Sequence, residues 1–177
     1  MPFWKHLRAA FLLPVMVTVV IPYLLHLIPR TGEFGIEEPS VEMQLLTRFA
    51  GFVAFYLGGL LLFSTIWLFA RYGHGTLAPW DPTAELVVRG IYRRVRNPMI
   101  TGVSLILVGE TLFTGSFYQL AWTLFFIFAN AAYIPLSEEP GLEKRFGERY
   151  LEYKQNVPRW LPRLRPWEPV EGDRETN

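Results

Sequence analysis

Two polar segments hold most of the residues that could bind a charged ligand. The first, residues 90–98, reads Gly-Ile-Tyr-Arg-Arg-Val-Arg-Asn-Pro and ends where a long apolar run begins. Pro98 suits the first turn of a helix with Asn97 as its cap, and the free N–H groups of such a turn attract a carboxylate or phosphate. The second is the pair Glu138 and Glu139, directly after the last apolar run. These carboxylates could stabilise the positive end of their own helix or meet a cation, and both readings stay open.

Composition excludes several other kinds of site. The chain has no Cys, so thiolate nucleophiles, disulfides and cysteine-based metal sites are ruled out. His6, His26 and His74 lie far apart and make no metal-ligand spacing, so we expect no metal. The formal net charge is only +1, which gives no bulk attraction to nucleic acid.

A glycine pattern of the dinucleotide-binding type occurs at residues 73–78, which read Gly-His-Gly-Thr-Leu-Ala. It follows an apolar run rather than a strand, and Pro79 and Pro82 oppose an immediate helix. We therefore interpret this stretch as a turn.

Long apolar runs must position the polar segments. There are four of them, at residues 9–28, 49–70, 99–115 and 117–136. A helix needs roughly 20 apolar residues to cross a hydrocarbon core of about 30 Å. These runs carry almost no charge and would leave no polar face toward water. We predict an all-α integral membrane protein, with about four transmembrane helices in a single domain of 177 residues.

The distribution of Lys and Arg predicts the orientation of these spans. The loop of residues 29–48 has two Arg against four Glu. The N-terminal segment and the loop of residues 71–98 are basic instead, and the tail of residues 137–177 carries eight Lys or Arg. Because basic residues collect on the cytoplasmic side, we expect both termini and the 71–98 loop in the cytoplasm, at the cell or inner membrane.

The tail is predicted to begin as an amphipathic helix. Its apolar side chains recur at helical spacing: Leu142, Phe146, Tyr150, Tyr153 and Val157. Such a helix lies on the bilayer surface or packs against another cytoplasmic segment, here the 71–98 loop.

Three of the polar residues inside the predicted spans are functional candidates. Glu110 is the one charge there, and an intramembrane carboxylate is by default a functional-site candidate. Because it lies near the outer end of its run, we favour a structural hydrogen bond or snorkelling. Asn130 and Tyr133 could contact a substrate or bridge helices, and we take them as substrate candidates.

Residues 73–162 carry two motifs in a fixed order around a hydrophobic hairpin. The first comprises Leu86-Val87, Gly90, Tyr92, Arg96, Asn97-Pro98 and Gly102; the second comprises Glu138-Glu139, Leu142, Phe146-Gly147, Tyr150, Tyr153 and Val157-Pro158. This arrangement resembles the isoprenylcysteine carboxyl methyltransferase family, and phospholipid methyltransferases share a looser version of it.

The resemblance implies a membrane methyltransferase that binds S-adenosylmethionine between its helices and its cytoplasmic tail. The loop and the amphipathic helix would close this cofactor pocket. The residues implied for it are Leu86, Val87, Gly90, Tyr92, Arg96, Asn97, Pro98, Met99, Ile100, Glu138 and Glu139. Glu138 would compensate the cofactor's positive charge, and the helix start at Asn97 its carboxylate. A membrane lipid or lipidated small molecule would be the acceptor; no catalytic residue or oligomeric state is implied.

The chain departs from the family's pattern where the acceptor matters. Asn97 and Ile100 stand where the family usually has His and Tyr. Ile134 replaces an arginine that the prenylcysteine enzymes use for the substrate carboxylate. The acceptor, and the choice between O-, N- and S-methylation, therefore stay open. An NADPH-dependent membrane reductase with a related helical core and a non-enzymatic membrane scaffold are the alternatives.

Overall fold

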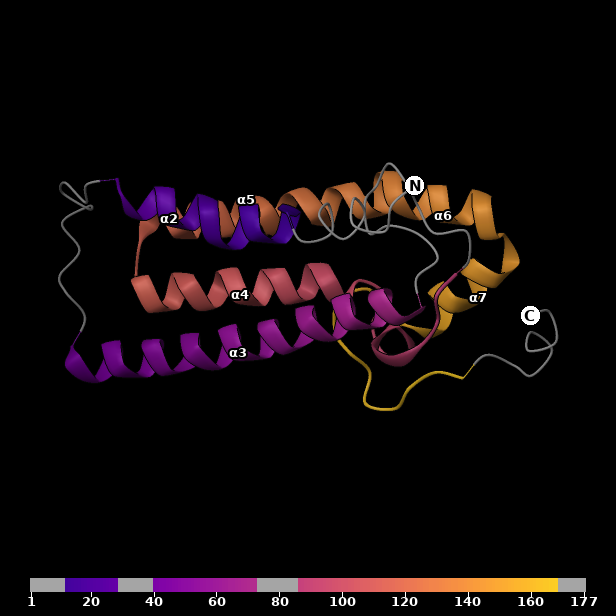
Figure 1. Cartoon of the computed structure of the whole chain (residues 1–177), viewed down its shortest axis with the longest axis horizontal. Coiled ribbons are helices and arrows are strands. Elements are labelled where there is room, and N and C mark those ends of the chain that lie inside the picture. Colours follow the sequence, from indigo (N-terminus) through magenta and orange to yellow (C-terminus); the bar gives the residue numbers. More distant parts are fainter. Residues whose placement is uncertain (1–11, 29–39, 73–85, 169–177) are drawn as a thin grey trace.

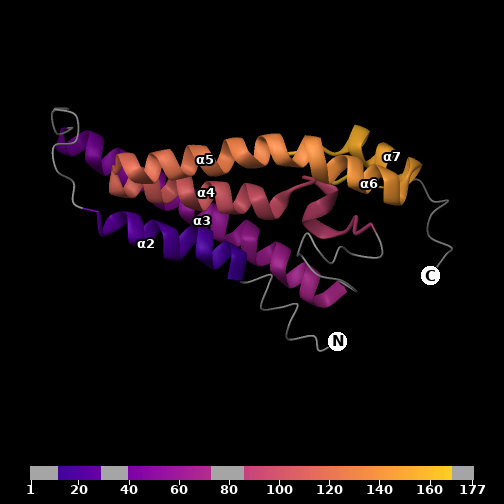
Figure 2. The same cartoon turned by 90° about the horizontal axis from the view of Figure 1, so that it is seen from above.

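A computed structural model describes residues 12–28, 40–72 and 86–168. Within these ranges the chain is helical and contains no strand, so the predicted all-α class is confirmed there. The helices form an elongated bundle, and the last two extend beyond one end of it (Figures 1 and 2). The glycine pattern of residues 73–78 and the basic N-terminal segment lie outside the described residues.

The first helical segment runs from Leu12 to His26 and consists largely of a π-turn, η1 (Met16–Val20), followed by α2 (Ile21–His26). Pro22 has no N–H to offer the carbonyl four residues before it. The chain adjusts one residue earlier, where the N–H of Ile21 bonds to the oxygen of Met16. Such local adjustments make proline tolerable in an apolar helix within a membrane.

Helix α3 (Val41–Tyr72) begins well before the predicted limit of residue 49. The reason is a cap, because the hydroxyl oxygen of Ser40 accepts the N–H of Met43 at 3.3 Å. The apolar run therefore predicted too short a helix, because the first two turns of α3 carry polar residues such as Glu42. At roughly 1.5 Å per residue its length is about 48 Å.

Helices α4 (Pro98–Thr114) and α5 (Phe117–Tyr133) form the predicted hairpin. The chain turns at Gly115, whose φ of 63° is a conformation that favours glycine. The two helices are joined by Gln119, whose side-chain nitrogen donates to the Glu110 carboxylate at 2.8 Å. The structural hydrogen bond favoured for Glu110 is thus present.

Glycines allow α3 and α4 to approach until their backbones touch. A Cβ atom added at Gly58 would lie 2.6 Å from the carbonyl oxygen of Gly102, and one at Gly51 would lie 2.7 Å from that of Gly109. Small residues at such contacts are typical of helix pairs in membranes, where close van der Waals packing replaces the hydrophobic driving force. This contact fixes the position of α4 and therefore of the loop that precedes it.

Helix α5 continues through a second π-turn, η3 (Ile134–Glu138), into α6 (Glu139–Phe146). The prediction of one amphipathic tail helix was wrong, because α7 (Glu148–Asn156) is a separate element. The break falls at Gly147, whose φ of 55° and ψ of −133° are open to glycine and strained for other residues. The turn lets Tyr150, Tyr153 and Val157 pack into one buried cluster.

Two helical stretches are long and apolar enough to cross a membrane, Val41–Leu68 and Phe117–Phe146. The helices Leu12–His26 and Pro98–Thr114 are apolar but shorter, so the count of four spans stays a prediction. Large apolar side chains on α3 and α5 point outward, and Phe63 and Phe128 are both 68% exposed. Such surfaces suit contact with lipid.

Candidate functional site

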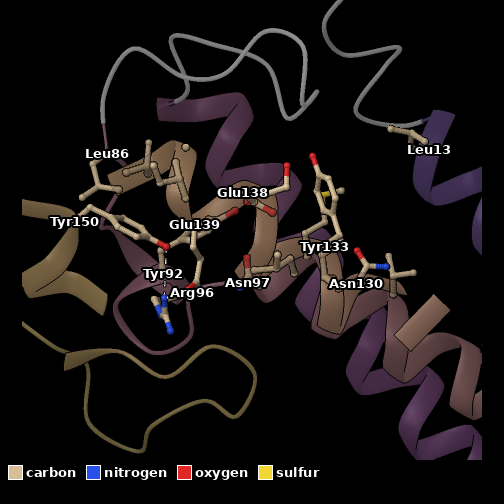
Figure 3. A pocket seen from close by; sticks show the side chains of 18 of the residues that line it. Leu13, Leu86, Tyr92, Arg96, Asn97, Asn130, Tyr133, Glu138, Glu139 and Tyr150 are labelled. Carbon is tan, nitrogen blue, oxygen red and sulfur yellow. Dashed lines mark hydrogen bonds and ion pairs between the residues drawn. The ribbon is translucent and has the colours of Figure 1, made fainter. Parts of the chain in front are cut away.

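A cavity of about 590 Å³ lies where the bundle meets the tail (Figure 3). Its volume falls within the range of roughly 300–1,000 Å³ typical of sites for small ligands. The cavity is built by the first helical segment, the 86–100 loop and helix start, the α5–η3–α6 helix and α7. It therefore collects residues from nearly the whole described chain.

Most of the residues predicted for the cofactor pocket line this cavity. They are Leu86, Val87, Tyr92, Arg96, Asn97, Met99, Ile100, Glu138 and Glu139. Gly90 and Pro98 are absent from its lining. Gly90, with a φ of 56°, lies against Leu68 of α3, and Pro98 is buried in the first turn of α4. Both shape the backbone that carries the lining residues.

The start of α4 faces the cavity with its free backbone donors. Asn97 is the N-cap residue, but its side chain makes no capping hydrogen bond, so the predicted side-chain cap was wrong. Its amide group lines the cavity instead. Thr101 donates its backbone N–H to the carbonyl of Asn97 at 3.0 Å, which leaves the N–H groups of Met99 and Ile100 without a partner in the helix. This corner can receive an anion.

Glu138 brings a negative charge to the same end of the cavity. It is the last residue of the π-turn η3, and its side chain lines the cavity in Figure 3. Within the described ranges Glu138 makes no ion pair. A carboxylate that is not already paired with a basic side chain can balance the charge of a cationic ligand.

Glu139, the next residue, is held by three basic side chains. Arg159 approaches it at 2.7 Å and Arg96 at 2.8 Å, and the Lys154 ammonium lies 3.4 Å away. Arg96 also donates from its Nε to the carbonyl of Val157 at 2.9 Å. Arg96 and Glu139 thus line the cavity but compensate each other's charge.

A hydrogen bond from the buried Tyr153 to the partly buried Tyr92 ties α7 to the loop before α4. The Tyr153 hydroxyl donates to the carbonyl of Tyr92 at 2.7 Å. Burial raises the pKa of both phenols well above its ordinary value, and for Tyr92 the nearby Tyr153 and Glu138 raise it further. Both side chains therefore stay neutral and can donate hydrogen bonds at any physiological pH.

The opposite end of the cavity is mainly apolar. Leu13, Pro14 and Val17 come from the first helical segment, and Phe126 comes from α5. The indole nitrogen of Trp122 donates to the carbonyl of Val17 at 3.1 Å and joins these two elements. This wall was missed from sequence, because an uninterrupted apolar run does not indicate which of its side chains face a cavity.

The substrate candidates Asn130 and Tyr133 lie between the two ends (Figure 3). Asn130 donates its side-chain nitrogen to the carbonyl of Phe126 at 2.9 Å, which leaves its amide oxygen to accept a further hydrogen bond. Sequence analysis also left other lining residues unassigned: Val103, Ile134, Ser137, Gly141, Leu142, Arg145, Tyr150 and Tyr153. Leu142, Tyr150 and Tyr153 had two signals, their helical spacing and their place in the second motif of the resemblance.

The cavity lacks the donor set of a metal site. Among the described residues, no group of three or more His, Asp or Glu side chains is placed to hold an ion. The polar groups that line it are backbone N–H groups, an amide, phenols and carboxylates. Such a set suits an organic ligand that carries charges of both signs.

The described residues form an all-helical bundle with long apolar helices and a cavity at one end. The sequence profile of the phospholipid methyltransferase family matches residues 46–149, more than half of the chain. The chain belongs to this family. It is also 40% identical over 65 residues to an uncharacterised protein of Haemophilus influenzae, which covers 36% of this chain and all of that protein. No solved structure matches the chain.

Proposed function

We propose that this chain is an S-adenosylmethionine-dependent methyltransferase of the membrane that acts on a lipidic acceptor. One observation carries the proposal. One cavity has two different ends. At one end lie the Glu138 carboxylate, which makes no ion pair among the described residues, and the start of α4; the other end is lined by apolar side chains of helices. The family match supports the same activity class.

The residues at the polar end fit the charges of S-adenosylmethionine. Glu138 would face its cationic groups, while the start of α4 and the amide of Asn97 would receive its carboxylate. Leu86 and Leu142 offer apolar surface for the adenine ring. When bound, this cofactor supplies an electrophilic methyl group on its sulfonium.

The work left to the protein is to place an acceptor in line and to exclude water. Val103, Ile134 and Phe126 give the cavity apolar lining, and Asn130 and Tyr133 offer hydrogen bonds for a polar headgroup. An acceptor of mixed character, with an apolar chain toward the first helical segment, suits this layout. The nature of the methylated atom stays open, as does the identity of any catalytic residue.

The arginine-rich loop lies at the cavity end of α4, and by the positive-inside rule this supports an orientation with the cavity on the cytoplasmic side. We propose four spans on this basis, with the Leu12–His26 and Pro98–Thr114 helices completing the two longer ones. A lipid acceptor could then enter laterally from the inner leaflet.

Calorimetric titration of the purified chain with S-adenosylmethionine and with NADPH tests the proposal. We expect binding of the first and none of the second. Binding of NADPH alone would point to the reductase alternative, and binding of neither would leave the scaffold. A labelled-methyl assay on a membrane lipid extract then identifies the acceptor class by the lipid that gains the label.

A further inference from the structure

We propose that residues 158–167, which follow α7, form an interfacial anchor that binds the anionic headgroup layer of the bilayer. This anchor segment reads Pro-Arg-Trp-Leu-Pro-Arg-Leu-Arg-Pro-Trp. It combines three arginines, two tryptophans and two leucines and contains no carboxylate. The proposal concerns a surface outside the cavity and does not depend on the methyltransferase activity.

Backbone contacts fix the depth of the anchor segment. Arg96 donates its backbone N–H to the carbonyl of Pro158 at 2.9 Å, and Asn97 does the same to Arg159 at 3.3 Å. The hydroxyl of Thr101 donates to the carbonyl of Trp160 at 3.3 Å. These three donors belong to the first turn of α4 or to the residues just before it. Because α4 is an apolar helix of a membrane bundle, its first turn lies where hydrocarbon gives way to headgroups.

The two leucines of the segment are far more exposed than their chemistry favours in water. Leu161 is 80% exposed and Leu164 is 92% exposed. The backbone around Leu164 is nevertheless held, because its carbonyl accepts Nη1 of Arg94 at 2.6 Å and the N–H of Arg163 donates to the Arg94 carbonyl at 3.0 Å. A fixed backbone with outward leucines, at this depth, suits insertion into the acyl–headgroup boundary.

The charges beside these leucines complement anionic lipid. Arg165 is exposed and makes no ion pair or hydrogen bond with the described residues. Arg163 uses Nη1 to donate to the carbonyl of Asn156 at 2.6 Å and keeps its remaining donors. The nearest acid in sequence, Glu168, already pairs with Arg93 at 2.7 Å. Clustered basic residues at this level attract phosphate and acidic headgroups.

Tryptophans complete the interfacial pattern. Trp160 and Trp167 lie near the two ends of the segment. The Trp167 ring packs against Tyr153 with 5.9 Å between the ring centroids. Its backbone N–H donates to the carbonyl of Arg93 at 2.8 Å. Tryptophan is enriched at the membrane–water boundary, where one side of the ring is apolar and the other polar. The occupant that satisfies leucine, arginine and tryptophan together is a bilayer surface.

The natural absence of Cys makes the anchor directly measurable. Leu161→Cys and Leu164→Cys each give the full chain a single site for a nitroxide label. Phe128→Cys on α5 serves as the lipid-exposed reference, and Gln155→Cys on α7 serves as the water-exposed one. The labelled chains are reconstituted into vesicles of phosphatidylcholine, with or without phosphatidylglycerol, and probed with oxygen and with a water-soluble nickel complex.

We expect labels at positions 161 and 164 to favour oxygen, as at Phe128→Cys, and to do so more strongly when phosphatidylglycerol is present. Arg163→Gln combined with Arg165→Gln should remove that dependence on the acidic lipid. Nickel accessibility equal to that of Gln155→Cys in both vesicles would overturn the proposal. Low accessibility to both oxygen and nickel would overturn the proposal and indicate that the leucines contact protein. Equal oxygen accessibility with and without phosphatidylglycerol would refute the recognition of anionic lipid.

Discussion

Arg159 grips Glu139 with two parallel hydrogen bonds, from Nε to Oε1 at 2.7 Å and from Nη2 to Oε2 at 2.9 Å. This fork joins the segment after α7 to the first residue of α6. Arg96, from the loop before α4, binds the same carboxylate at 2.8 Å. One side chain therefore holds together three parts of the chain, and two of these, the loop before α4 and α6, line the cavity. Its neighbour Glu138 lines the cavity without an ion pair among the described residues.

Removing the paired hydrogen bonds between Arg159 and Glu139 should lower the stability of the folded chain. For Arg159→Gln we expect the free energy of unfolding to fall by about 1.5–3 kcal/mol, because hydrogen bonds to charged groups are lost on one side of a buried carboxylate. Unfolding followed by circular dichroism in detergent measures the change. Arg165→Gln, at a site without such contacts, is the control and should shift stability by no more than about 0.5 kcal/mol.

A double-mutant cycle separates the pair from its surroundings. Glu139→Gln and Arg159→Gln made together should cost less than the sum of the single changes, because each single change strands the partner charge. Strict additivity would show that the fork contributes nothing to stability and would refute the role given to Glu139.

Glu138 and Glu139 should respond differently to loss of charge. We expect Glu138→Gln to weaken binding of S-adenosylmethionine by about tenfold or more, equivalent to about 1.4 kcal/mol, while leaving the melting temperature nearly unchanged. Glu139→Gln should lower the melting temperature first. Calorimetric titration and thermal unfolding of both variants provide the comparison. Unchanged binding in Glu138→Gln would remove this residue from the site.

The contact between α3 and α4 offers a test with adjacent residues. Gly58→Ala places a methyl group 2.6 Å from the Gly102 carbonyl oxygen and should cost about 1–3 kcal/mol through overpacking. A Cβ atom added at Gly59 would meet no other atom within 4 Å, so Gly59→Ala should leave stability unchanged or raise it by up to about 1 kcal/mol. Thermal unfolding in one detergent compares them, and equal effects would contradict the packing described.

Alkaline pH should expose the role of Tyr153. Burial holds its pKa above the ordinary value of about 10, so the unfolded chain loses this proton before the folded chain does. Its contribution to stability is complete below pH 10 and declines as pH rises further, by up to about 1.4 kcal/mol per pH unit. Tyr153→Phe should lower stability at pH 7 by about 0.5–1.5 kcal/mol, since the bond to Tyr92 is lost. It should also flatten the decline above pH 10, as melting curves between pH 7 and 11 would reveal.

The apolar runs predicted the helices well and their ends less well. Composition located α4 and α5 to within a few residues, because each helix is an almost uninterrupted run of apolar side chains. The early start of α3 depended on one hydroxyl, that of Ser40, acting as a cap. The split between α6 and α7 depended on the backbone angles of Gly147. Periodicity carries neither kind of information.

The cavity-lining residues were largely predicted where they belong to the two motifs of the resemblance, and the contacts made outside those motifs were missed. The resemblance placed Glu138 opposite the cofactor's cationic groups and the helix start at Asn97 opposite its carboxylate, and both residues line the same cavity. Arg159 was not assigned to Glu139, because a contact between residues 20 apart across a helix break has no periodic signal. The π-turn at Ile134–Glu138 was also unforeseen, although Pro135 lies within it.

The Trp122–Val17 hydrogen bond has a consequence for how the cavity can diversify. The first helical segment precedes residues 46–149, the part of the chain that the family shares. It supplies Leu13, Pro14 and Val17 to the apolar wall, far from the ion pairs that hold the tail. A change at Leu13 or Val17 would therefore alter the apolar end of the cavity without removing any residue from its polar end. Under the proposed function, the range of acceptors could then change through the first helical segment while the proposed cofactor residues stay the same.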